Sequence, residues 1–338
     1  SRLRREGAPV DRSRSGDHLQ KRRRRRMRTV PNAMPRGQLT LRTRRPMRYD
    51  AALINRLKRH TAMETPSKNH IFGPVPSRRL GRSLGVDLVP FKTCTYDCIY
   101  CQLGRTTCKT LDRSEYVPLD EVISQLKGKL PTRPDYITLS GSGEPTLFSR
   151  TGELIDRIKA MTDVPVAVLT NGSLLWRKDV RDQLMNADLV VPSLDAGDEA
   201  TFRSVNRPHE EITFEKMLNG LVDFRREFSG QYWLEILLLG GYTAMEAELV
   251  KLARCIDLIN PDRVQLNTVT RPPAESFAVG VSRDRLGELA AMLTPPVEVI
   301  ADFRSIRERG EFSAGREDIL EILRRRPCSM EDIADGLG

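Results

Sequence analysis

The sequence predicts an α/β protein whose main domain is an open, partial barrel of TIM type with six strand–helix units, (βα)6. Two observations lead to this fold class. Short apolar runs alternate in regular order with amphipathic stretches of helical period, and the strands are apolar on both faces. A repeated strand–helix order builds a parallel sheet with right-handed crossovers. Six units are fewer than the eight of a closed barrel, so the sheet is expected to stay open.

The elements follow from this alternation, in chain order. Strands are expected at Leu84–Val89, Tyr136–Ser140, Val164–Thr170, Leu189–Leu194, Tyr232–Leu239 and Arg263–Asn267. Helices are expected at Leu119–Leu130, Ser149–Met161, Trp176–Met185, Phe214–Phe228, Ala244–Ile259 and Arg283–Leu293, with a short extra strand at Val297–Ile300. In such folds ligands bind where strands run into the loops that follow them. Candidate site residues are therefore sought at the carboxyl ends of the strands.

Three cysteines follow the first predicted strand. Cys94, Cys98 and Cys101 have the spacing C-x3-C-x2-C. Three thiolates can bind three irons of a [4Fe–4S] cluster and leave the fourth iron open to a small molecule. Two alternatives remain: Cys108 completes a four-cysteine zinc or ferredoxin-like site, or the thiols are simply buried. The isolated Cys255 and Cys328 are expected to be structural.

A glycine-rich turn follows the next predicted strand. It reads Ser140-Gly141-Ser142-Gly143-Glu144-Pro145. Glycines allow positive φ and close backbone approach, and the Glu144 carboxylate is an anionic hydrogen-bond acceptor. Such a turn is common by itself, but here it lies one strand after the cysteine loop.

On these two motifs the sequence resembles the radical S-adenosylmethionine (SAM) superfamily over residues 71–305. Tyr100, just before the third cysteine, matches the cluster motif of that superfamily. Ser142-Gly143-Glu144 is similar to its Gly-Gly-Glu motif, with Ser at the first position. The resemblance implies that Ser142, Gly143 and Glu144 receive the methionine amino group of SAM. It further implies that Asn171, Ser193 and Asp195, at the ends of the next two strands, contact the SAM carboxylate and ribose.

The resemblance also implies an activity. A [4Fe–4S] cluster on Cys94, Cys98 and Cys101, reduced by a ferredoxin or flavodoxin, would cleave SAM to a 5′-deoxyadenosyl radical that abstracts hydrogen from a substrate. The expected substrate is a small metabolite, a peptide or an RNA nucleotide. The alternative is an Fe–S electron-transfer or sensing protein with a nucleic-acid-binding tail, which would use Cys108 as fourth ligand.

Residues 72–81 and 101–104 resemble a subgroup of Fe–S oxidoreductases near the wyosine-type tRNA-modifying and molybdopterin-pathway enzymes. Arginines before the first strand could bind an anionic substrate, or could be solvated loop charges. Polar residues late in the sheet could line a cavity, or could form a satisfied hydrogen-bond network. The arginines are Arg78, Arg79 and Arg82, and the late polar residues are Glu235, Gln265, Asn267 and Arg271.

The two ends of the chain are expected to differ from the domain at residues 69–305. The formal net charge is +10, but the first 70 residues hold 21 basic and 5 acidic side chains, and the rest hold 34 and 40. Residues 1–68 form an Arg-rich leader that is expected to be disordered. This leader is interpreted as upstream sequence preceding a start at Met63, a solvated tail or a nucleic-acid-binding arm. Residues 306–338 are expected to form a helix pair, like a truncated winged helix.

The composition restricts the cellular compartments in which the protein is expected. Uninterrupted apolar runs fall far short of the roughly 18 residues that a membrane-spanning helix needs, and no secretory signal opens the sequence. Clustered cysteines in an α/β chain favour a metal or cluster site over disulfides. The sequence therefore predicts a cytoplasmic protein with no membrane association.

Overall fold

The structure, a computed structural model, describes residues 69–294, 297–300, 320 and 323. The predicted leader at 1–68 lies outside the described residues, as does nearly all of the predicted helix pair at 306–338. Of the described residues, no helix is both long enough and apolar enough to cross a membrane. The described domain begins at Asn69.

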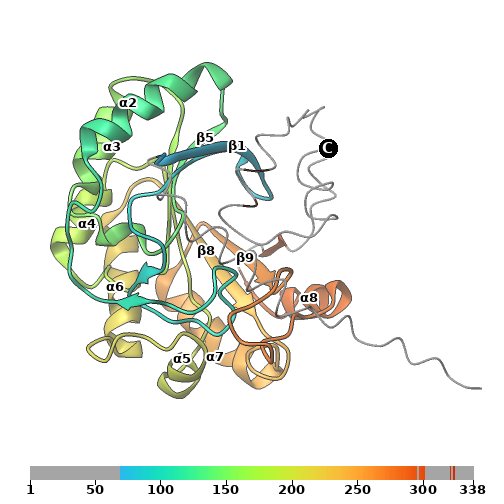
Figure 1. Cartoon of the computed structure of the whole chain (residues 1–338). Coiled ribbons are helices and arrows are strands. Elements are labelled where there is room, and N and C mark those ends of the chain that lie inside the picture. The colour runs from blue at the N-terminus through green and yellow to red at the C-terminus, as the bar shows by residue number, and fades with distance from the viewer. Residues whose placement is uncertain (1–68, 295–296, 301–319, 321–322, 324–338) are drawn as a thin grey trace, which may run out of the picture. The chain divides into compact units, whose positions relative to one another are not determined.

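This domain is built on an eight-stranded sheet with the order β1-β2-β5-β6-β7-β8-β9-β10 (Figure 1). Its strands are β1 (Ile71–Ser77), β2 (Gly81–Val86), β5 (Tyr136–Leu139), β6 (Val166–Thr170), β7 (Leu189–Pro192), β8 (Gln231–Leu238), β9 (Arg263–Thr268) and β10 (Val297–Val299). β1 is antiparallel to β2, and every other neighbouring pair is parallel. In the described part of the chain β1 and β10 are the two edges, so the sheet is open.

Helices connect the parallel strands and lie along the outer side of the sheet (Figure 1). They are α2 (Leu119–Lys129), α3 (Thr151–Lys159), α4 (Lys178–Leu184), α5 (Glu199–Val205), α6 (Phe214–Glu227), α7 (Glu246–Ile259) and α8 (Arg283–Ala290). Local sequence explains several starts. The Thr213 hydroxyl accepts from Lys216 N–H before α6, and the Asp198 carboxylate accepts from Thr201 N–H before α5. The predicted alternation of parallel strands and helices is confirmed.

Three details of the prediction were wrong. The first parallel strand is β2, which ends at Val86, and Leu88 and Val89 are buried beyond the sheet rather than paired in it. β1 was not predicted because it contains Pro74 and Pro76, which cannot donate to a ladder; an edge strand tolerates them. α5 was missed because its seven residues are too few for a clear helical period.

The two faces of the sheet bury different side chains. On β8, Leu234, Ile236 and Leu238 pack into the main core with the helices, whereas the alternate residue Trp233 joins a small cluster on the inner face. The other buried members of that inner cluster are Leu80, Ala167, Leu189 and Val191. Further along β8, the inward position after Trp233 is Glu235, and β9 places Gln265 and Asn267 beside it. The inner face is therefore apolar near the amino ends of the strands and has a polar layer further along, beyond which Leu237 and Val269 join another apolar cluster.

Candidate active site

The three cysteines lie in a loop at the carboxyl end of β2. Cys94 ends the short strand β3 (Thr93–Cys94), which pairs in parallel with β4 (Cys108–Lys109). Cys98 and Cys101 lie in the segment between these two strands and, like Cys94, are half-buried, whereas Cys108 is exposed. The loop therefore holds the three motif cysteines in the interior and leaves the fourth at the surface.

Each of the three sulfurs accepts a hydrogen bond from a different part of the chain. Asn171 Nδ2 donates to Cys94 Sγ over 3.6 Å, from the turn that follows β6. Asn206 Nδ2, at the end of α5, donates to Cys98 Sγ over 3.6 Å. Lys92 Nζ donates to Cys101 Sγ over 3.1 Å. Such donors favour sulfur in its anionic form, which is the form that binds metal.

The surroundings of the thiols oppose their ionisation unless a cation is present. Burial raises the pKa of Cys94 to about 12, and Glu144 adds to the rise. Burial also raises the pKa of Cys98 well above its ordinary value, and the charges of Asp195, Cys94 and Cys101 add to this rise. Three thiolates this close together therefore need positive charge between them, which the irons of a cluster would supply.

The donor set fits a cluster better than a single ion. Within the described residues, no group of three or more His, Cys, Asp or Glu side chains gathers so as to hold one metal ion. Such a group is what a structural zinc site requires. In a [4Fe–4S] cluster each thiolate binds a different iron, so the three sulfurs surround the group instead of meeting at one point. Cys94, Cys98 and Cys101 are the three half-buried thiols that would take this role.

The glycine-rich turn after β5 lies directly against the cysteine loop. A Cβ added to Gly143 would lie 1.8 Å from the carbonyl oxygen of Thr93, so only glycine fits there. Ser142 N–H donates to Asp87 Oδ1 over 3.0 Å, and the Ser142 hydroxyl also donates to the Asp87 carboxylate. Asp87, which sequence reasoning missed, thereby fixes the turn from the end of β2.

Glu144 is 2 % exposed and its carboxylate is heavily hydrogen-bonded. Oε1 accepts from the Thr146 N–H and hydroxyl and from the Thr170 hydroxyl, and Oε2 accepts from Asn171 N–H over 2.8 Å. Burial raises the pKa of Glu144 above its ordinary value, although these hydrogen bonds act in the opposite direction. The carboxylate thus joins the ends of β5 and β6, and among the described residues Oε2 has Asn171 as its one donor.

Asp195 follows β7 and connects the predicted residue Tyr100 to one that sequence reasoning missed. Asp195 Oδ2 accepts from the Tyr100 hydroxyl and, over 2.7 Å, from Asn206 Nδ2, while Oδ1 accepts from Leu237 N–H over 3.0 Å. Burial raises the pKa of Asp195 to about 6 against these hydrogen bonds. Asn206 lies at the end of the unpredicted helix α5, so no periodic signal marked it. Through Asn206, Asp195 acts on the sulfur of Cys98.

The last two residues of the expected SAM set lie on neighbouring strand ends. Besides its contact with Cys94, Asn171 Nδ2 donates to Thr95 Oγ1 over 2.8 Å, so its side chain packs across the cysteine loop. Ser193 forms a parallel bridge with Glu235 and is half-buried. The structure therefore brings the residues of both motifs and the two following strand ends to one edge of the sheet.

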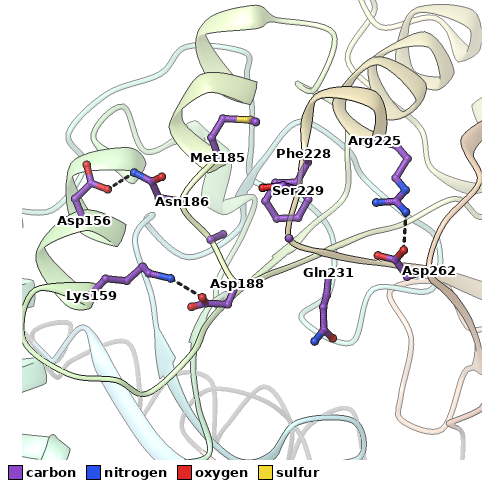
Figure 2. A pocket seen from close by; sticks show the side chains of 12 residues that line it. Asp156, Lys159, Met185, Asn186, Asp188, Arg225, Phe228, Ser229, Gln231 and Asp262 are labelled. Carbon is purple, nitrogen blue, oxygen red and sulfur yellow. Dashed lines mark hydrogen bonds and ion pairs between the residues drawn. The ribbon is translucent and has the colours of Figure 1, made fainter.

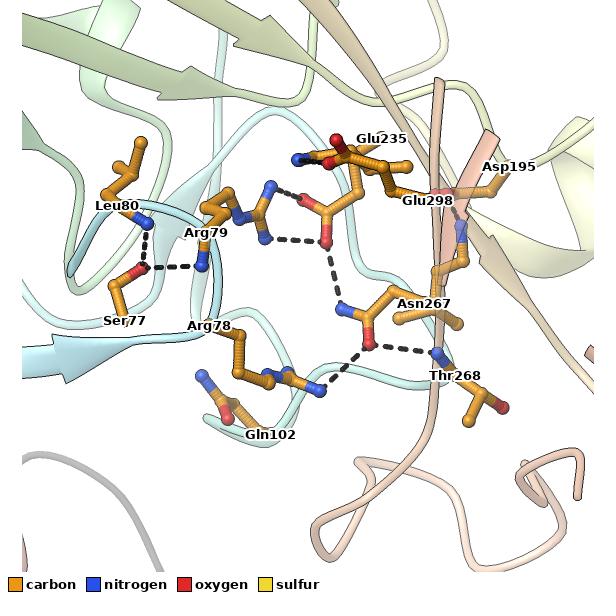
Figure 3. Close-up of polar contacts among 12 residues, drawn as sticks. Ser77, Arg78, Arg79, Leu80, Gln102, Asp195, Glu235, Asn267, Thr268 and Glu298 are labelled. Atoms are coloured by element: carbon orange, nitrogen blue, oxygen red, sulfur yellow. Dashed lines mark hydrogen bonds and ion pairs between the residues drawn. The ribbon is translucent and has the colours of Figure 1, made fainter. Parts of the chain in front are cut away.

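A polar layer crosses the inner face of the sheet (Figure 3). Arg79, from the β1–β2 turn, makes a two-pronged ion pair with Glu235 on β8, over 2.9 and 2.8 Å. Asn267 Nδ2 donates to Glu235 Oε1 over 2.9 Å, and Arg78 Nη1 donates to Asn267 Oδ1 over 3.2 Å. Burial would raise the pKa of Glu235, but Arg79, Asn267 and Arg78 together hold it below its ordinary value.

The remaining residues expected near a substrate have separate positions. Gln265 Nε2 donates to Glu298 on β10 over 3.1 Å, and Arg271 Nη1 donates to Gln102, the residue after Cys101, over 2.8 Å. Arg82 lies elsewhere: Nη2 donates to the Thr132 carbonyl over 2.7 Å in an exposed position. Arg82 is therefore an exposed charge apart from the polar layer, because β2 directs its side chain away from the inner face.

A groove of about 990 Å³ lies at the opposite end of the sheet (Figure 2). Its lining includes Asp188, Gln231 and Asp262, which immediately precede or begin β7, β8 and β9. Four of its charged side chains form two ion pairs, Lys159 with Asp188 and Arg225 with Asp262, and Asp156 accepts from Asn186 Nδ2. Reactions in parallel α/β folds take place at the carboxyl ends of the strands, so this groove at the amino ends is not the candidate active site.

Comparison with known proteins identifies the class. The family model of the radical SAM superfamily matches residues 88–253, which contain the cysteine loop, the glycine-rich turn and the ends of β6 and β7. By this match the chain is a member of the radical SAM superfamily, a superfamily of enzymes.

Similarity to individual proteins gives a more specific family assignment. The chain is 36 % identical over 276 residues to a UPF0026 protein of Methanocaldococcus jannaschii, covering 78 % of this chain and 84 % of that protein. It is 37 % identical over 270 residues to a UPF0026 protein of Helicobacter pylori, of which it covers 86 %. The chain belongs to the UPF0026 family.

Two further similarities cover only part of the other protein, and the second concerns the fold alone. The chain is 41 % identical over 287 residues to a protein of Brachyspira hyodysenteriae named GTPase Obg, covering 83 % of this chain but 42 % of that longer protein. The structure of Streptococcus suis SuiB bound to its precursor peptide superposes with a TM-score of 0.50 at 12 % identity, over 62 % of this chain and 47 % of SuiB. The SuiB comparison shows a shared fold.

Proposed function

We propose that this enzyme cleaves SAM reductively at a [4Fe–4S] cluster and that the resulting 5′-deoxyadenosyl radical abstracts hydrogen from a substrate on the inner face of the sheet. The observation that carries the proposal is the set of three half-buried motif thiols, each accepting an N–H donor from a different segment. When bound, the cluster supplies the electron that breaks the S–C5′ bond of SAM. The protein's own residues hold, orient and shield the reactants.

Cys94, Cys98 and Cys101 would hold the cluster through their thiolates. Tyr100 would keep the loop in place, because its hydroxyl is bound by the buried Asp195 carboxylate. Cys108 is exposed on β4 and takes no part in this set. With three protein ligands for four irons, one iron is left for SAM.

The glycine-rich turn would bind the methionine part of SAM. Ser142, Gly143 and Glu144 lie against the cysteine loop, and Glu144 Oε2 can accept one more donor besides Asn171 N–H because a carboxylate oxygen has two lone pairs. That donor would be the SAM ammonium. Asn171 and the half-buried Ser193 would contact the carboxylate and the ribose. Asp195 would act through Tyr100 and Asn206, which donate to its Oδ2, and its Oδ1 could accept a ribose hydroxyl besides Leu237 N–H.

The substrate would bind over the polar layer. Arg79 is neutralised by its two-pronged pair with Glu235, so we assign it to positioning Glu235 and Asn267. Arg78 and Gln265 are the remaining candidates for contact with a polar or anionic substrate, with Asn267 between them on the sheet. Small metabolites, peptides and RNA nucleotides are the substrate classes to test. The proposed place in the subgroup near the wyosine-type and molybdopterin-pathway enzymes does not fix the substrate.

The proposed reaction needs an electron donor and a compartment that keeps the thiols reduced. Reduction requires a low-potential donor such as a ferredoxin or flavodoxin. A three-cysteine cluster site requires reduced thiols, which a cytoplasmic location provides. A truncation that removes residues 1–62 and starts at Met63 would test whether the Arg-rich leader is needed for cluster binding and SAM cleavage.

A direct experiment tests the function. The chain is reconstituted anaerobically with iron and sulfide, reduced with dithionite and given SAM, and 5′-deoxyadenosine is measured by chromatography. We expect an absorption band typical of [4Fe–4S], a change in its electron paramagnetic resonance (EPR) signal on adding SAM, and formation of 5′-deoxyadenosine. Absence of product together with an unchanged EPR signal would contradict the proposal. Deuterium transfer from candidate substrates into 5′-deoxyadenosine would then identify the substrate.

A further inference from the structure

The residue that donates to Cys101 is itself unusual. Lys92 is 3 % exposed, although lysine is rarely buried without a partner of opposite charge. Among the described residues, the one hydrogen-bond partner of its ammonium is Cys101 Sγ, at 3.1 Å. A neutral thiol is a weak acceptor and compensates a buried charge poorly. A metal-bound thiolate at Cys101 would place a negative charge beside this ammonium.

The backbone holds Lys92 in this position at a cost. Its φ of 59° lies in the left-handed region, which residues other than glycine seldom adopt. Three backbone hydrogen bonds offset the strain: Lys92 N–H donates to the Ser142 carbonyl over 2.7 Å, and its carbonyl accepts from Thr107 N–H and Cys108 N–H. Lys92 thus lies between the glycine-rich turn and both ends of the cysteine loop. Strain maintained in this way is typical of a functional position.

Lys92 is close to both ends of the motif. It precedes Cys94 by two residues, and its ammonium lies 3.1 Å from Cys101 Sγ. The other two N–H donors, Asn171 and Asn206, are neutral amides. In the described site, Lys92 is the cationic donor to a thiol.

We infer that Lys92 is a positioning residue for the cluster: its ammonium compensates the charge of the cluster and raises its reduction potential. This inference rests on the proposed function. A cluster bound by three thiolates is an anion, and reduction adds one more negative charge. A cation beside a ligand sulfur in a buried site stabilises the reduced form more than the oxidised form, because attraction grows with charge and is weakly screened there.

The test compares the midpoint potential of the cluster in four chains without SAM, by EPR-monitored redox titration. Lys92→Met removes the charge and keeps the length of the side chain, and Lys92→Arg keeps the charge. Lys109→Met is the matched control, because Lys109 also lies in the β3–β4 pair but donates to the carbonyls of Arg207 and Pro208 instead of a sulfur. Iron and sulfide contents are measured for each chain.

We expect Lys92→Met to lower the reduction equilibrium constant about tenfold, equal to about 59 mV for a one-electron couple. Lys92→Arg should stay near the wild-type potential, and Lys109→Met should match wild type. An unchanged potential in Lys92→Met, or an equal shift in Lys109→Met, would overturn the inference.

A second measurement covers the case in which Lys92→Met binds no cluster. Folding is then checked by circular dichroism, and Lys92→Gln, which keeps an N–H donor without the charge, is compared with Lys92→Arg. Loss of iron in Lys92→Gln with retention in Lys92→Arg supports charge compensation, and loss in both overturns it. A wild-type chain that binds no [4Fe–4S] cluster would refute the proposed function itself, so the two failures are distinguishable.

Discussion

The two ends of the parallel sheet use polar side chains in opposite ways. At the amino ends, Lys159–Asp188 and Arg225–Asp262 pair around an open groove, and their side chains are between 23 and 40 % exposed. At the carboxyl ends, Glu144, Asp195 and Lys92 are at most 3 % exposed. The Lys92 ammonium donates to a cysteine sulfur, and the two carboxylates accept from backbone N–H groups and from side chains of the site. The groove at the amino ends therefore carries the more exposed, weaker interactions. In this molecule, burial and directed hydrogen bonds mark the site better than concavity does.

The largest effect is expected from the thiols. Replacing Cys94, Cys98 or Cys101 with serine should abolish cluster binding and 5′-deoxyadenosine formation, because each thiolate is expected to hold one iron. Iron content, the EPR signal and product formation measure the loss. Cys108→Ser is the control and should retain all three, because Cys108 is exposed. Loss of the cluster in Cys108→Ser would instead favour a four-cysteine, electron-transfer site.

Ion pairs provide the next comparison between the two ends. The Arg79–Glu235 pair has side chains 12 and 17 % exposed, whereas Lys159–Asp188 has side chains 40 and 36 % exposed. Arg79→Met leaves a buried carboxylate without its main partner and should lower the free energy of unfolding by about 3–5 kcal/mol. Lys159→Met should lower it by roughly 0–1 kcal/mol. Urea unfolding measures both, and equal losses would contradict the distinction between the ends.

Backbone packing gives a smaller effect. Gly143→Ala places a Cβ 1.8 Å from the Thr93 carbonyl oxygen, so the glycine-rich turn or the cysteine loop must move. We expect a loss of about 1–3 kcal/mol of stability. SAM should then no longer change the EPR signal of the cluster. Gly128→Ala on α2 is the matched control: a Cβ there meets nothing within 4 Å, and alanine should stabilise the helix by about 0.5–1 kcal/mol.

The smallest effect concerns an exposed pair at the carboxyl end. Asp198 and Lys251 are each 36 % exposed, and the hydrogen bond from Lys251 lowers the pKa of Asp198 to about 2. Since the folded pKa lies below the ordinary value of 3.8, the pair stabilises the fold above about pH 4, and this stability is lost as the pH falls through 2. Solvent screening limits it to about 1 kcal/mol or less. Thermal unfolding of Asp198→Asn and wild type between pH 2 and 6 measures the difference. A larger difference would place this pair with the buried ones.

Much of this arrangement could be predicted because its signals are local. The cysteine spacing and the glycine-rich turn each lie within one loop, and the periodicity of the strands and helices places those loops at one edge of the sheet. Glycine at position 143 is required by the approach of Thr93, a contact that sequence alone does not reveal although the residue type does.

The residues that escaped prediction depend on contacts between distant segments. Asn206 reaches Cys98 across 108 positions, and nothing in its own neighbourhood distinguishes it. Lys92 lies two residues before Cys94, but its role depends on burial and on a left-handed backbone conformation, which the residue type lysine does not indicate. Arg79 was expected either to bind an anionic substrate or to be a solvated loop charge, and its pairing with Glu235, 156 positions later, was not foreseen.

The separation of 156 positions between Arg79 and Glu235 has a consequence for folding during synthesis. A chain made from its amino end presents β1, the β1–β2 turn and β2 before β8, so Arg79 acquires its carboxylate only after β8 has been made. Until then the hairpin has neither the ion pair nor the inner-face contact of Leu80 with Trp233. Forming such a contact requires closing a long loop, which slows folding. The hairpin can pair with β5 as soon as that strand is made, but the contacts of Arg79 and Leu80 on the inner face are completed only after β8 has been made.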